Sequence, residues 1–345
     1  MNPLPFAVIG VGHLGGFHAK LAAQIEIIDL RGVFDLDRAR AHEIAGATGT
    51  KAFDDLDQLL HEVRAVSVVV PTVVHYEVAV MALEHGCHVF IEKPITQTVE
   101  EGARLVELAE HKGLKLQVGH IERFNPAVLS LKGHTLEPMF IESHRLSQFN
   151  PRGTDVSVIL DLMIHDIDII LTLIDSPLCS VDACGVAVVS EAEDIANVRL
   201  GFENGAVANI TSSRISVNPM RKMRMFQKNM YIAMDFLKKS SEVFSLIPEN
   251  DPMPRGFSMT VDTIGVGEKK KKIIYEKPAA PQVNSLQYEL ETFARCIQED
   301  TRPAVTGREA VRALELASVI QSKIKRPEGS ACAPGTFTLS NPFAS

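Results

Sequence analysis

The sequence predicts an α/β protein of two domains, a doubly wound parallel sheet followed by an α+β domain with an open, largely antiparallel sheet. The chain has 345 residues, 46 % hydrophobic and 23 % charged, which is too long for one typical core. Short apolar runs alternate with helical patterns up to about residue 120, as in βα units. After Gly119 a long helical run precedes several strand-like runs. We therefore expect domains at residues 1–120 and 121–325, and a tail at 326–345.

The first domain shows five strands that alternate with five amphipathic helices. Strands are predicted at Phe6–Ile9, Ile28–Phe34, Val66–Val70, His88–Ile91 and Leu116–Val118. Helices, with apolar residues at helical spacing, are predicted at Leu14–Gln24, Arg38–Ala47, Leu56–Val63, Val74–His85 and Val99–Lys112. This alternation predicts parallel strands with helices on both faces of the sheet.

The second domain begins with a helical run at Asp155–Ile174. In Ala196–Ser216, "ENG" separates two alternating runs, which predicts a hairpin. Residues 285–300 and 306–324 form two amphipathic patterns around a Thr-Arg-Pro turn, and these helices could pack back on the first domain. We interpret Lys269–Lys272 as a solvated strand end or turn, and the Pro-, Gly- and Ser-rich tail as mobile or packed on a neighbouring subunit.

Composition argues against several classes of function. The formal charge of −8 opposes general affinity for nucleic acid or an anionic membrane, and no apolar run is long enough to span a bilayer. The start "MNPLP" lacks the basic and apolar regions of a secretory signal, so we expect a cytoplasmic protein. We expect reduced thiols rather than disulfides or a zinc site, because no C-x-x-C pair occurs among Cys87, Cys179, Cys184, Cys296 and Cys332.

A glycine-rich loop follows the first predicted strand. In "FAVIGVGHLGG", Gly10, Gly12 and Gly15 form G-x-G-x-x-G, with His13 and Leu14 inside it at the opening of a helix. Such glycines allow a tight turn, close approach of the backbone to a pyrophosphate, and close helix-to-strand packing. The alternative is a strand-to-helix turn without a ligand. We expect a dinucleotide site.

Asp35 strengthens this expectation. It follows Gly15 by twenty positions, at the end of the second predicted strand. A carboxylate there accepts hydrogen bonds from the hydroxyls of the adenine ribose and repels a 2′-phosphate. The sequence therefore favours NAD over NADP, although Arg38 keeps NADP as the second option.

Two more clusters lie at the carboxyl ends of predicted strands, where open α/β sheets bind ligands. Pro71, Thr72 and His75 follow the third strand, and Glu92 and Lys93 follow the fourth. We expect these residues at the cofactor. Lys93 would lie beside the nicotinamide and the reacting hydroxyl, and its alternative is an ordinary exposed lysine.

The apolar stretch "DLMIHDIDII" carries several ionisable residues. Asp161 and His165 are four apart and Asp168 lies one turn beyond, so a helix would place them on one face. Apolar residues on nearly all sides indicate a covered helix, and a buried charge is costly unless it is paired or used. His165 is then either a general acid/base oriented by a carboxylate or part of a satisfied core His–Asp pair, with metal ligation a weaker third option.

Polar residues that could hold a substrate occur in two segments. His120, Arg123 and Asn125 follow the fifth strand in "GHIERFNP". A second group lies in "SSRISVNPMRKMRMF" and contains Arg214, Arg221, Lys222 and Arg224. Arginine suits bidentate contacts to the phosphates of an anionic substrate. The alternative is exposed sheet residues or intersubunit salt bridges.

The chain resembles the glucose-fructose oxidoreductase, inositol dehydrogenase and MocA family along nearly its whole length. The glycine fingerprint, "VVPTVVHYEVAVMALEHGCHVFIEKPIT", "DLMIHDID" and "ELETFARCIQEDTRPAVTGREAVRALELA" carry the resemblance. It implies an N-terminal Rossmann domain, bound NAD or NADP, and a C-terminal domain whose open sheet often forms oligomers. The family's E-K-P lysine falls on Lys93 and its D-x-x-x-H pair on Asp161 and His165. The resemblance implies that Lys93 binds the hydroxyl, His165 acts as acid/base, and Asp161 orients His165.

The resemblance further implies hydride transfer between nicotinamide and a sugar, cyclitol, nucleotide-sugar or related alcohol, and we expect a ring hydroxyl as the reacting group and no metal, because nicotinamide chemistry can proceed without one. "GHIERFNP" and "RKMRMFQKNMYIAMDF" are similar to the branch that acts on UDP-N-acetylglucosamine in lipid A biosynthesis. Alternatives are another sugar or cyclitol dehydrogenase, a redox-neutral glycosidase that uses NAD, and a dinucleotide-binding regulator without turnover. We expect a sugar or nucleotide-sugar substrate and a homodimer or homotetramer.

Overall fold

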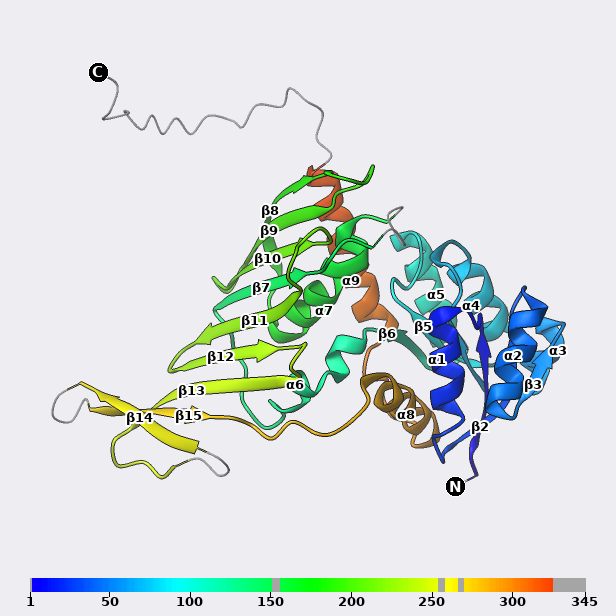
Figure 1. Ribbon diagram of the computed structural model, residues 1–345, viewed down its shortest axis with the longest axis horizontal. Coiled ribbons are helices and arrows are strands. Elements are labelled where there is room, and N and C mark those ends of the chain that lie inside the picture. The colour runs from blue at the N-terminus through cyan, green and yellow to red at the C-terminus, as the bar shows by residue number, and fades with distance from the viewer. Residues whose placement is uncertain (1, 151–155, 254–257, 266–269, 325–345) are drawn as a thin grey trace, which may run out of the picture.

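The computed structural model describes residues 2–150, 156–253, 258–265 and 270–324. Two sheets with their helices form the two halves of the molecule (Figure 1). Asp155, Lys269, Cys332 and the tail at 326–345 lie outside the described residues, so the expectations for them stay predictions. Among the described residues, no helix has the length and apolar character to span a membrane.

The first sheet is parallel throughout, with the strand order β3-β2-β1-β4-β5-β6. Its strands are β1 (Leu4–Ile9), β2 (Ile28–Phe34), β3 (Lys51–Phe53), β4 (Ala65–Val68), β5 (His88–Glu92) and β6 (Leu116–Gly119). The predicted doubly wound sheet is confirmed, and only the three-residue edge strand β3 was not predicted. The order reverses between β1 and β4, so a ligand crevice is expected at the carboxyl ends of these two strands.

The helices of this domain cover the sheet, and they differ in whether a side chain caps their first turn. They are α1 (His13–Ala22), α2 (Arg38–Thr48), α3 (Leu56–His61), the 3₁₀ turn η1 (Thr72–Val74), α4 (His75–Glu84) and α5 (Val99–His111). The side chains of Asp37, Asp55 and Thr98 cap α2, α3 and α5 by accepting backbone N–H groups. No side chain caps α1, whose first N–H groups therefore remain available to an anion.

The second sheet has the order β14-β15-β13-β12-β11-β7-β10-β9-β8 and is antiparallel except for the pair β7–β10. Its strands are β7 (Phe140–Leu146), β8 (Leu178–Val186), β9 (Ile195–Phe202), β10 (Val207–Ser213), β11 (Met220–Gln227), β12 (Met230–Asp235), β13 (Ser240–Pro248), β14 (Ser258–Ile264) and β15 (Lys271–Glu276). The largely antiparallel sheet and the β9–β10 hairpin are confirmed. The β14–β15 pair projects from the body of the molecule (Figure 1).

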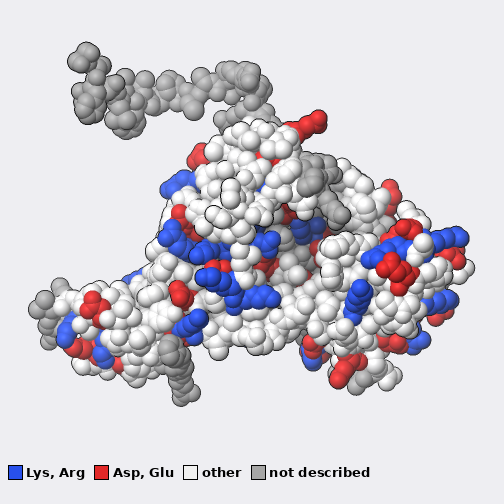
Figure 2. Space-filling view, viewed as in Figure 1, with Lys and Arg blue, Asp and Glu red and all other residues white. Residues whose placement is uncertain are grey.

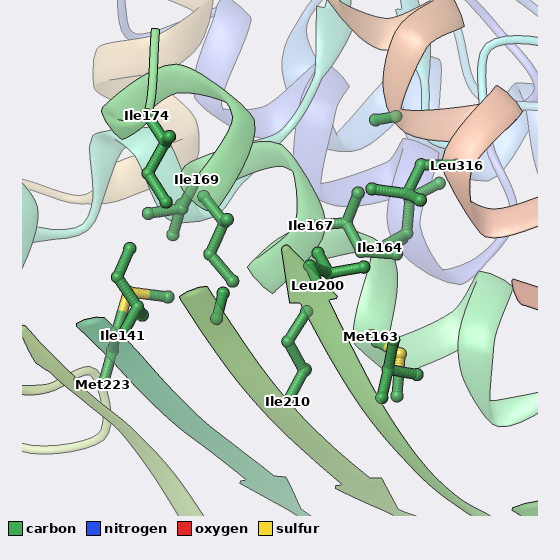
Figure 3. Packing of buried hydrophobic residues seen from close by; sticks show 14 of the residues in the cluster. Ile141, Met163, Ile164, Ile167, Ile169, Ile174, Leu200, Ile210, Met223 and Leu316 are labelled. Atoms are coloured by element: carbon green, nitrogen blue, oxygen red, sulfur yellow. The ribbon is translucent and has the colours of Figure 1, made fainter. Parts of the chain in front are cut away.

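One face of this sheet is covered by α7 (Ile164–Leu173), which follows a π-helical turn, η3 (Ile159–Met163). Helical structure starts at residue 158, later than the predicted run. Ile164 and Ile167 of α7 pack on Leu200 and Ile210 of the sheet, and all four are fully buried (Figure 3). Each such side chain contributes roughly 1.5–3 kcal/mol by leaving water. This packing sets the distance between α7 and the second sheet.

The last two helices, α8 (Ser285–Gln298) and α9 (Gly307–Ile324), return to the first domain. Leu290 and Phe293 of α8 share a core with Phe6 and Phe90 of the first sheet. The α9 helix contributes to both remaining cores and thereby ties the domains together. Two short elements, η2 (Ile121–Phe124) and α6 (Pro126–Leu129), link the sheets. A boundary at residue 120 therefore does not enclose all the residues of the first core.

The cysteines of the described residues are free thiols. Cys87 and Cys296 are buried, and burial raises the pKa of each thiol to about 11. Cys179 and Cys184 are exposed on β8. These four positions agree with the expectation of small core or surface residues.

Candidate active site

The three glycines of the loop after β1 differ in what a side chain would meet at each position. Gly10 has φ +81°, and a Cβ added there would lie 2.5 Å from the carbonyl oxygen of Val69. A Cβ on Gly15 would lie 1.8 Å from the Gly10 carbonyl oxygen. A Cβ on Gly12 would meet nothing within 4 Å, so this glycine faces open space at the uncapped start of α1. The space and the free N–H groups fit a pyrophosphate. His13 and Leu14 lie exposed at the same helix start.

Asp35 is held rigidly at the carboxyl end of β2. Its Oδ2 accepts the N–H of Val11 at 2.7 Å, and its Oδ1 accepts the N–H of Asp37 at 2.9 Å. The remaining lone pairs can accept ribose hydroxyls. Leu36, 91 % exposed, and Val73, 64 % exposed, offer apolar surface at the ends of β2 and β4. Such surface suits a flat adenine ring, and the sequence-based prediction missed both residues.

The arginines near Asp35 are already engaged. Arg38 points its Nε to Asp54 at 3.4 Å. Arg40 donates from Nε to the Val11 carbonyl oxygen at 2.9 Å and from Nη1 to Glu43 at 2.7 Å. Arg40 thus stabilises the glycine loop through its hydrogen bond to Val11. A fixed carboxylate with committed arginines fits NAD, whose ribose carries no 2′-phosphate.

His75, which the sequence predicts at the cofactor, offers no free ring nitrogen to a ligand. It is 1 % exposed, and its ring nitrogens lie 2.9 Å from the carbonyl oxygens of Val70 and Pro94. Both polar atoms are therefore used to join the end of β4 to the segment after β5. Pro71 and Thr72, in contrast, remain accessible at the end of β4.

Glu92 is held by groups of the protein next to Lys93. Its carboxylate is 3.1 Å from His18 Nε2, and His18 Nδ1 is 2.9 Å from the Ser67 hydroxyl. Its Oε2 accepts the N–H of Lys93 at 3.2 Å. A Cβ on Gly119 would lie 2.7 Å from Glu92 Oε1, so only glycine leaves room for this carboxylate. The sequence-based prediction missed His18, which carries no local signal beyond its place on α1.

Lys93 and Asp161 form the contact between the domains at this site. Lys93 Nζ donates to the backbone carbonyl of Asp161 at 2.7 Å and lies 3.5 Å from Asp161 Oδ1. The predicted Asp161–His165 pair is not formed, since Nδ1 of His165 has no hydrogen-bond partner among the described residues. The reason is the π-helical turn around Asp161, which changes the register of side chains relative to a regular helix.

His165 is half-buried and surrounded by positive charge. Burial lowers its pKa well below the ordinary value, and the charges of Lys93, Arg145, His120 and Arg221 add to this effect. The ring of His120 lies edge-on at 6.4 Å between centroids. His165 is therefore neutral at neutral pH, which is the protonation state of a general base.

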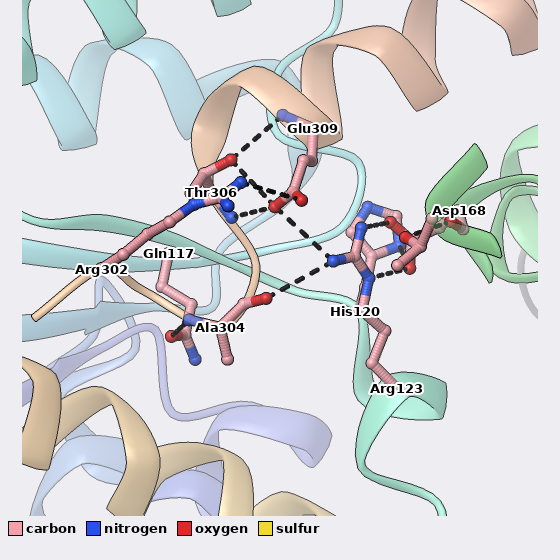
Figure 4. A network of polar contacts seen from close by, with 9 residues as sticks. Gln117, His120, Arg123, Asp168, Arg302, Ala304, Thr306 and Glu309 are labelled. Atoms are coloured by element: carbon pink, nitrogen blue, oxygen red, sulfur yellow. Dashed lines mark hydrogen bonds and ion pairs between the residues drawn. The ribbon is translucent and has the colours of Figure 1, made fainter. Parts of the chain in front are cut away.

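The buried acids of α7 are balanced by arginines. Asp166 accepts from Arg145 Nε at 2.8 Å and Nη2 at 3.1 Å, and Glu122 accepts from Arg145 Nη1 at 2.7 Å. Asp168 accepts from Arg123 Nε at 2.7 Å and Nη2 at 2.6 Å (Figure 4). Each acid in the apolar stretch thus has a partner, and Arg145 and Glu122 were not predicted.

Arg123 and Asn125, predicted to bind substrate, are structural residues. Arg123 also contacts Glu309 at 3.5 Å and the Ala304 carbonyl at 3.4 Å, which closes a network between η2, α7 and α9 (Figure 4). Asn125 caps α6 and donates to Glu122 at 2.9 Å. Most donors of Arg123 and both amide hydrogens of Asn125 are thus used within the protein.

His120, in contrast, is buried in this region with both ring nitrogens unpartnered among the described residues. Its Nδ1 lies 3.9 Å from Asp168 Oδ2 (Figure 4). Burial lowers the pKa of His120. Because it faces His165, it stays a candidate for the site.

Arg214 and Arg224 are placed away from the site. Arg214 is 5 % exposed and donates to the carbonyls of Val156 and Glu193. Arg224 pairs with Glu142 of β7 and lines a cavity of about 300 Å³ on the outer face of the sheet. The structure therefore does not bring either side chain to the cleft beside Lys93 and His165.

Arg221 is the basic residue of β11 that reaches the site. It shares its strand face with Met223, which is buried under α7, whereas Arg224 points to the other face. Its Nη1 lies 3.6 Å from Glu122, and its side chain is 41 % exposed. Figure 2 shows Lys and Arg side chains gathered around the hollow between the two halves of the molecule.

A glycine loop that leaves room for a pyrophosphate, and a lysine beside a neutral histidine at the carboxyl edge of the sheet, define a dinucleotide-dependent oxidoreductase. Residues 4–120 match the family model "Oxidoreductase family, NAD-binding Rossmann fold", and residues 127–230 match "GFO/IDH/MocA C-terminal domain". The chain belongs to the Gfo/Idh/MocA oxidoreductase family. The predicted family and NAD cofactor are confirmed.

Several known proteins are similar to this chain in sequence or in fold. UDP-N-acetylglucosamine 3-dehydrogenase from Acidithiobacillus ferrooxidans is 43 % identical over 238 residues, which are 69 % of this chain and 75 % of the relative. Its solved structure superposes with TM-score 0.83 at 35 % identity and covers 94 % of this chain and 98 % of that one. The scyllo-inositol 2-dehydrogenase (NAD(+)) of Bacillus subtilis is 29 % identical over 61 % of this chain and 67 % of its own length. Levoglucosan dehydrogenase in complex with NADH shares the fold at 17 % identity and TM-score 0.78.

Proposed function

We propose that this protein is an NAD-dependent dehydrogenase that oxidises the 3-hydroxyl of UDP-N-acetylglucosamine. The observation that carries the substrate is the 43 % identity to the enzyme that is named for this reaction. The placement of Lys93, His165 and Arg221 around one hollow supports it. Each of the three residues has a distinct task.

The glycine loop and Asp35 would hold the dinucleotide, as their geometry fits the pyrophosphate and the ribose hydroxyls. When bound, NAD supplies the acceptor for the hydride. Pro71 and Thr72 lie at the edge of this site, next to the switch point of the sheet.

Lys93 and His165 divide the proton chemistry. Lys93 Nζ, anchored on Asp161, donates to the sugar hydroxyl and stabilises the negative charge that develops on its oxygen. Neutral His165 accepts the hydroxyl proton as hydride leaves the same carbon, so the alcohol becomes a ketone. The low pKa of His165 keeps it ready to accept this proton, and its imidazolium then returns the proton to solvent.

Arg221 is assigned to the diphosphate of the substrate. Its guanidinium is part-exposed, and its partner Glu122 is already held by Arg145. A planar guanidinium can bind phosphate oxygens in bidentate fashion, which a free sugar would not use. We therefore expect discrimination between the nucleotide-sugar and free N-acetylglucosamine.

We further propose a cytoplasmic homodimer or homotetramer that associates through the outer face of the second sheet. Three aromatic side chains line up across β11, β12 and β13 on this face. Phe226 and Tyr231 have ring centroids 4.8 Å apart, and Tyr231 and Phe244 are 5.7 Å apart. Phe226 is 39 % exposed in the single chain, and such apolar surface favours contact with another subunit.

The test is the rate of NADH formation with UDP-N-acetylglucosamine, free N-acetylglucosamine and myo-inositol. We expect NADH only with the nucleotide-sugar. Lys93→Met and His165→Asn should each lower kcat by about 10²–10⁴-fold while NAD binding is retained. Arg221→Met should raise KM for the nucleotide-sugar, and Arg224→Met, on the outer face, should not.

Equal rates with free N-acetylglucosamine would contradict the assignment of Arg221, and turnover of myo-inositol alone would contradict the substrate. Bound NAD without net NADH for any of the three would favour the redox-neutral alternative. Full activity of His165→Asn would refute its role as the base.

A further inference from the structure

Three potential metal ligands meet on the surface of the N-terminal domain, outside the site described above. Asp57 and His61 lie one turn apart on α3, and His85 directly follows α4. One ligand atom from each residue can be chosen so that all three lie within 4.8 Å of one another. No step of the proposed dehydrogenase reaction uses them.

The distances suit a small ion. His85 Nε2 lies 2.7 Å from Asp57 Oδ1, and His61 Nε2 lies 3.5 Å from Asp57 Oδ2. Ligands of a tetrahedral zinc ion at about 2.0–2.1 Å stand about 3.3 Å from each other. The His61 distance is close to this value, and the His85 distance, which runs to the other carboxylate oxygen, needs an opening of about half an ångström.

The hydrogen bonding of His85 leaves Nε2 as the ligand atom that faces Asp57. Its Nδ1 lies 2.8 Å from the Met81 carbonyl oxygen, which can only accept, so Nδ1 carries the hydrogen. In the neutral ring, Nε2 then directs a lone pair at the carboxylate of Asp57. This 2.7 Å contact is an ion pair when Nε2 carries a hydrogen, and a metal ion can take the place of that hydrogen. An Nδ1–H bonded to a carbonyl is also the usual arrangement of a metal-binding histidine.

The accessibility and ligand types favour zinc. The side chains of Asp57 and His61 are 62 % and 70 % exposed, which leaves room for a water as fourth ligand. Two imidazoles with one carboxylate suit Zn²⁺, whereas Mg²⁺ and Ca²⁺ take oxygen ligands. Glu84, next in sequence to His85, adds negative charge and is paired with Lys112 at 2.7 Å.

We propose that Asp57, His61 and His85 form a Zn²⁺ site that joins α3 to the end of α4. Nε2 of each histidine and the carboxylate of Asp57, which faces His85 with Oδ1 and His61 with Oδ2, would bind the ion, with water completing the coordination. The ion would replace the proton that otherwise separates His85 from Asp57. It would cross-link two helices that the chain connects through β4 and η1.

The test uses tag-free, full-length protein stripped of metal by a chelator. Zn²⁺ is titrated by calorimetry, and bound zinc is measured after dialysis. We expect the wild type to bind one equivalent more than His61→Gln or His85→Gln, and His42→Gln, an exposed histidine on α2, to match the wild type. Zn²⁺ should also raise the unfolding temperature of the wild type and of His42→Gln, but not that of the two site variants.

Two further measurements separate this proposal from weaker alternatives. Co²⁺ should give the visible absorbance of tetrahedral coordination in the wild type and lose it in His85→Gln. Equal zinc binding by the wild type and the His61→Gln/His85→Gln double variant would overturn the site, as would equal binding of Mg²⁺. The unfolding temperatures without metal show that the variants fold, since these side chains lie at the surface.

Discussion

The same methyl group, added at two glycines of the nucleotide loop, should have two different effects. A Cβ at Gly15 would sit 1.8 Å from the carbonyl oxygen of Gly10, and both are backbone positions that cannot swing away. Overpacking of this kind costs about 1–3 kcal/mol or more. A Cβ at Gly12 meets no protein atom within 4 Å, so its effect on folding should stay within about 0.5 kcal/mol.

For NAD binding, in contrast, we expect a large effect from the substitution at Gly12. At Gly12 the methyl occupies the space through which the pyrophosphate approaches, and we expect Gly12→Ala to weaken NAD binding at least tenfold. A ligand at 100 times its Kd stabilises the folded protein by about 2.7 kcal/mol. The same NAD concentration should stabilise Gly12→Ala by only about 1.4 kcal/mol, because it is then ten times the Kd.

The assay is urea unfolding of the wild type, Gly12→Ala and Gly15→Ala with and without NAD, together with calorimetric Kd values. Two results would refute the reasoning. One is a Gly12→Ala protein that NAD stabilises as strongly as the wild type, which would mean that the space at Gly12 is not the pyrophosphate path. The other is a Gly15→Ala protein with wild-type stability, which would mean that the loop yields to a contact of 1.8 Å.

Two further predictions concern stability. Arg145→Met should lower the free energy of unfolding by about 3–5 kcal/mol, because it leaves Asp166 and Glu122 buried without their cation, and a loss below about 1 kcal/mol in urea unfolding would contradict this. His88→Gln should flatten the pH dependence of stability between pH 6.5 and about 4, since burial, followed by the charges of Arg64 and Lys115, lowers the pKa of His88 to about 4. In that window the unfolded chain binds the proton and the folded chain does not, so wild-type stability falls as pH falls. Parallel slopes for wild type and variant would rule out His88 as the cause.

Much of the fold could be predicted because its signals are local. The strand β2 begins and ends where the apolar run Ile28–Phe34 does, and the loop residues of the β9–β10 hairpin mark its turn. The strand β3 was missed because three residues carry no period. The π-helical turn η3 was missed because its apolar residues fit a regular helix equally well.

In the candidate site, too, features that depend on local sequence could be predicted and features that depend on distant residues could not. The positions of Gly12, Asp35 and Lys93 just after strands could be predicted, because the apolar runs that precede them mark where each strand ends. Arg123 was predicted to bind substrate, but Asp168, 45 positions away, takes its donors. The partners of Arg145, Arg221 and His85 are likewise distant in sequence, and no pattern within one segment can show which polar groups tertiary packing brings together.

The position of α8 has a consequence for how the protein assembles on the ribosome. Phe90, which is translated early, packs edge-on against Phe293, with ring centroids 5.8 Å apart. Gln298 of α8 donates a hydrogen bond to the backbone carbonyl of Asn2 at 3.2 Å. The first domain therefore lacks one wall of its core until nearly three hundred residues have been synthesised. A nascent chain that stops at residue 120 exposes Phe6 and Phe90 to chaperones, and the domain that is translated first is closed by a helix that is translated near the end.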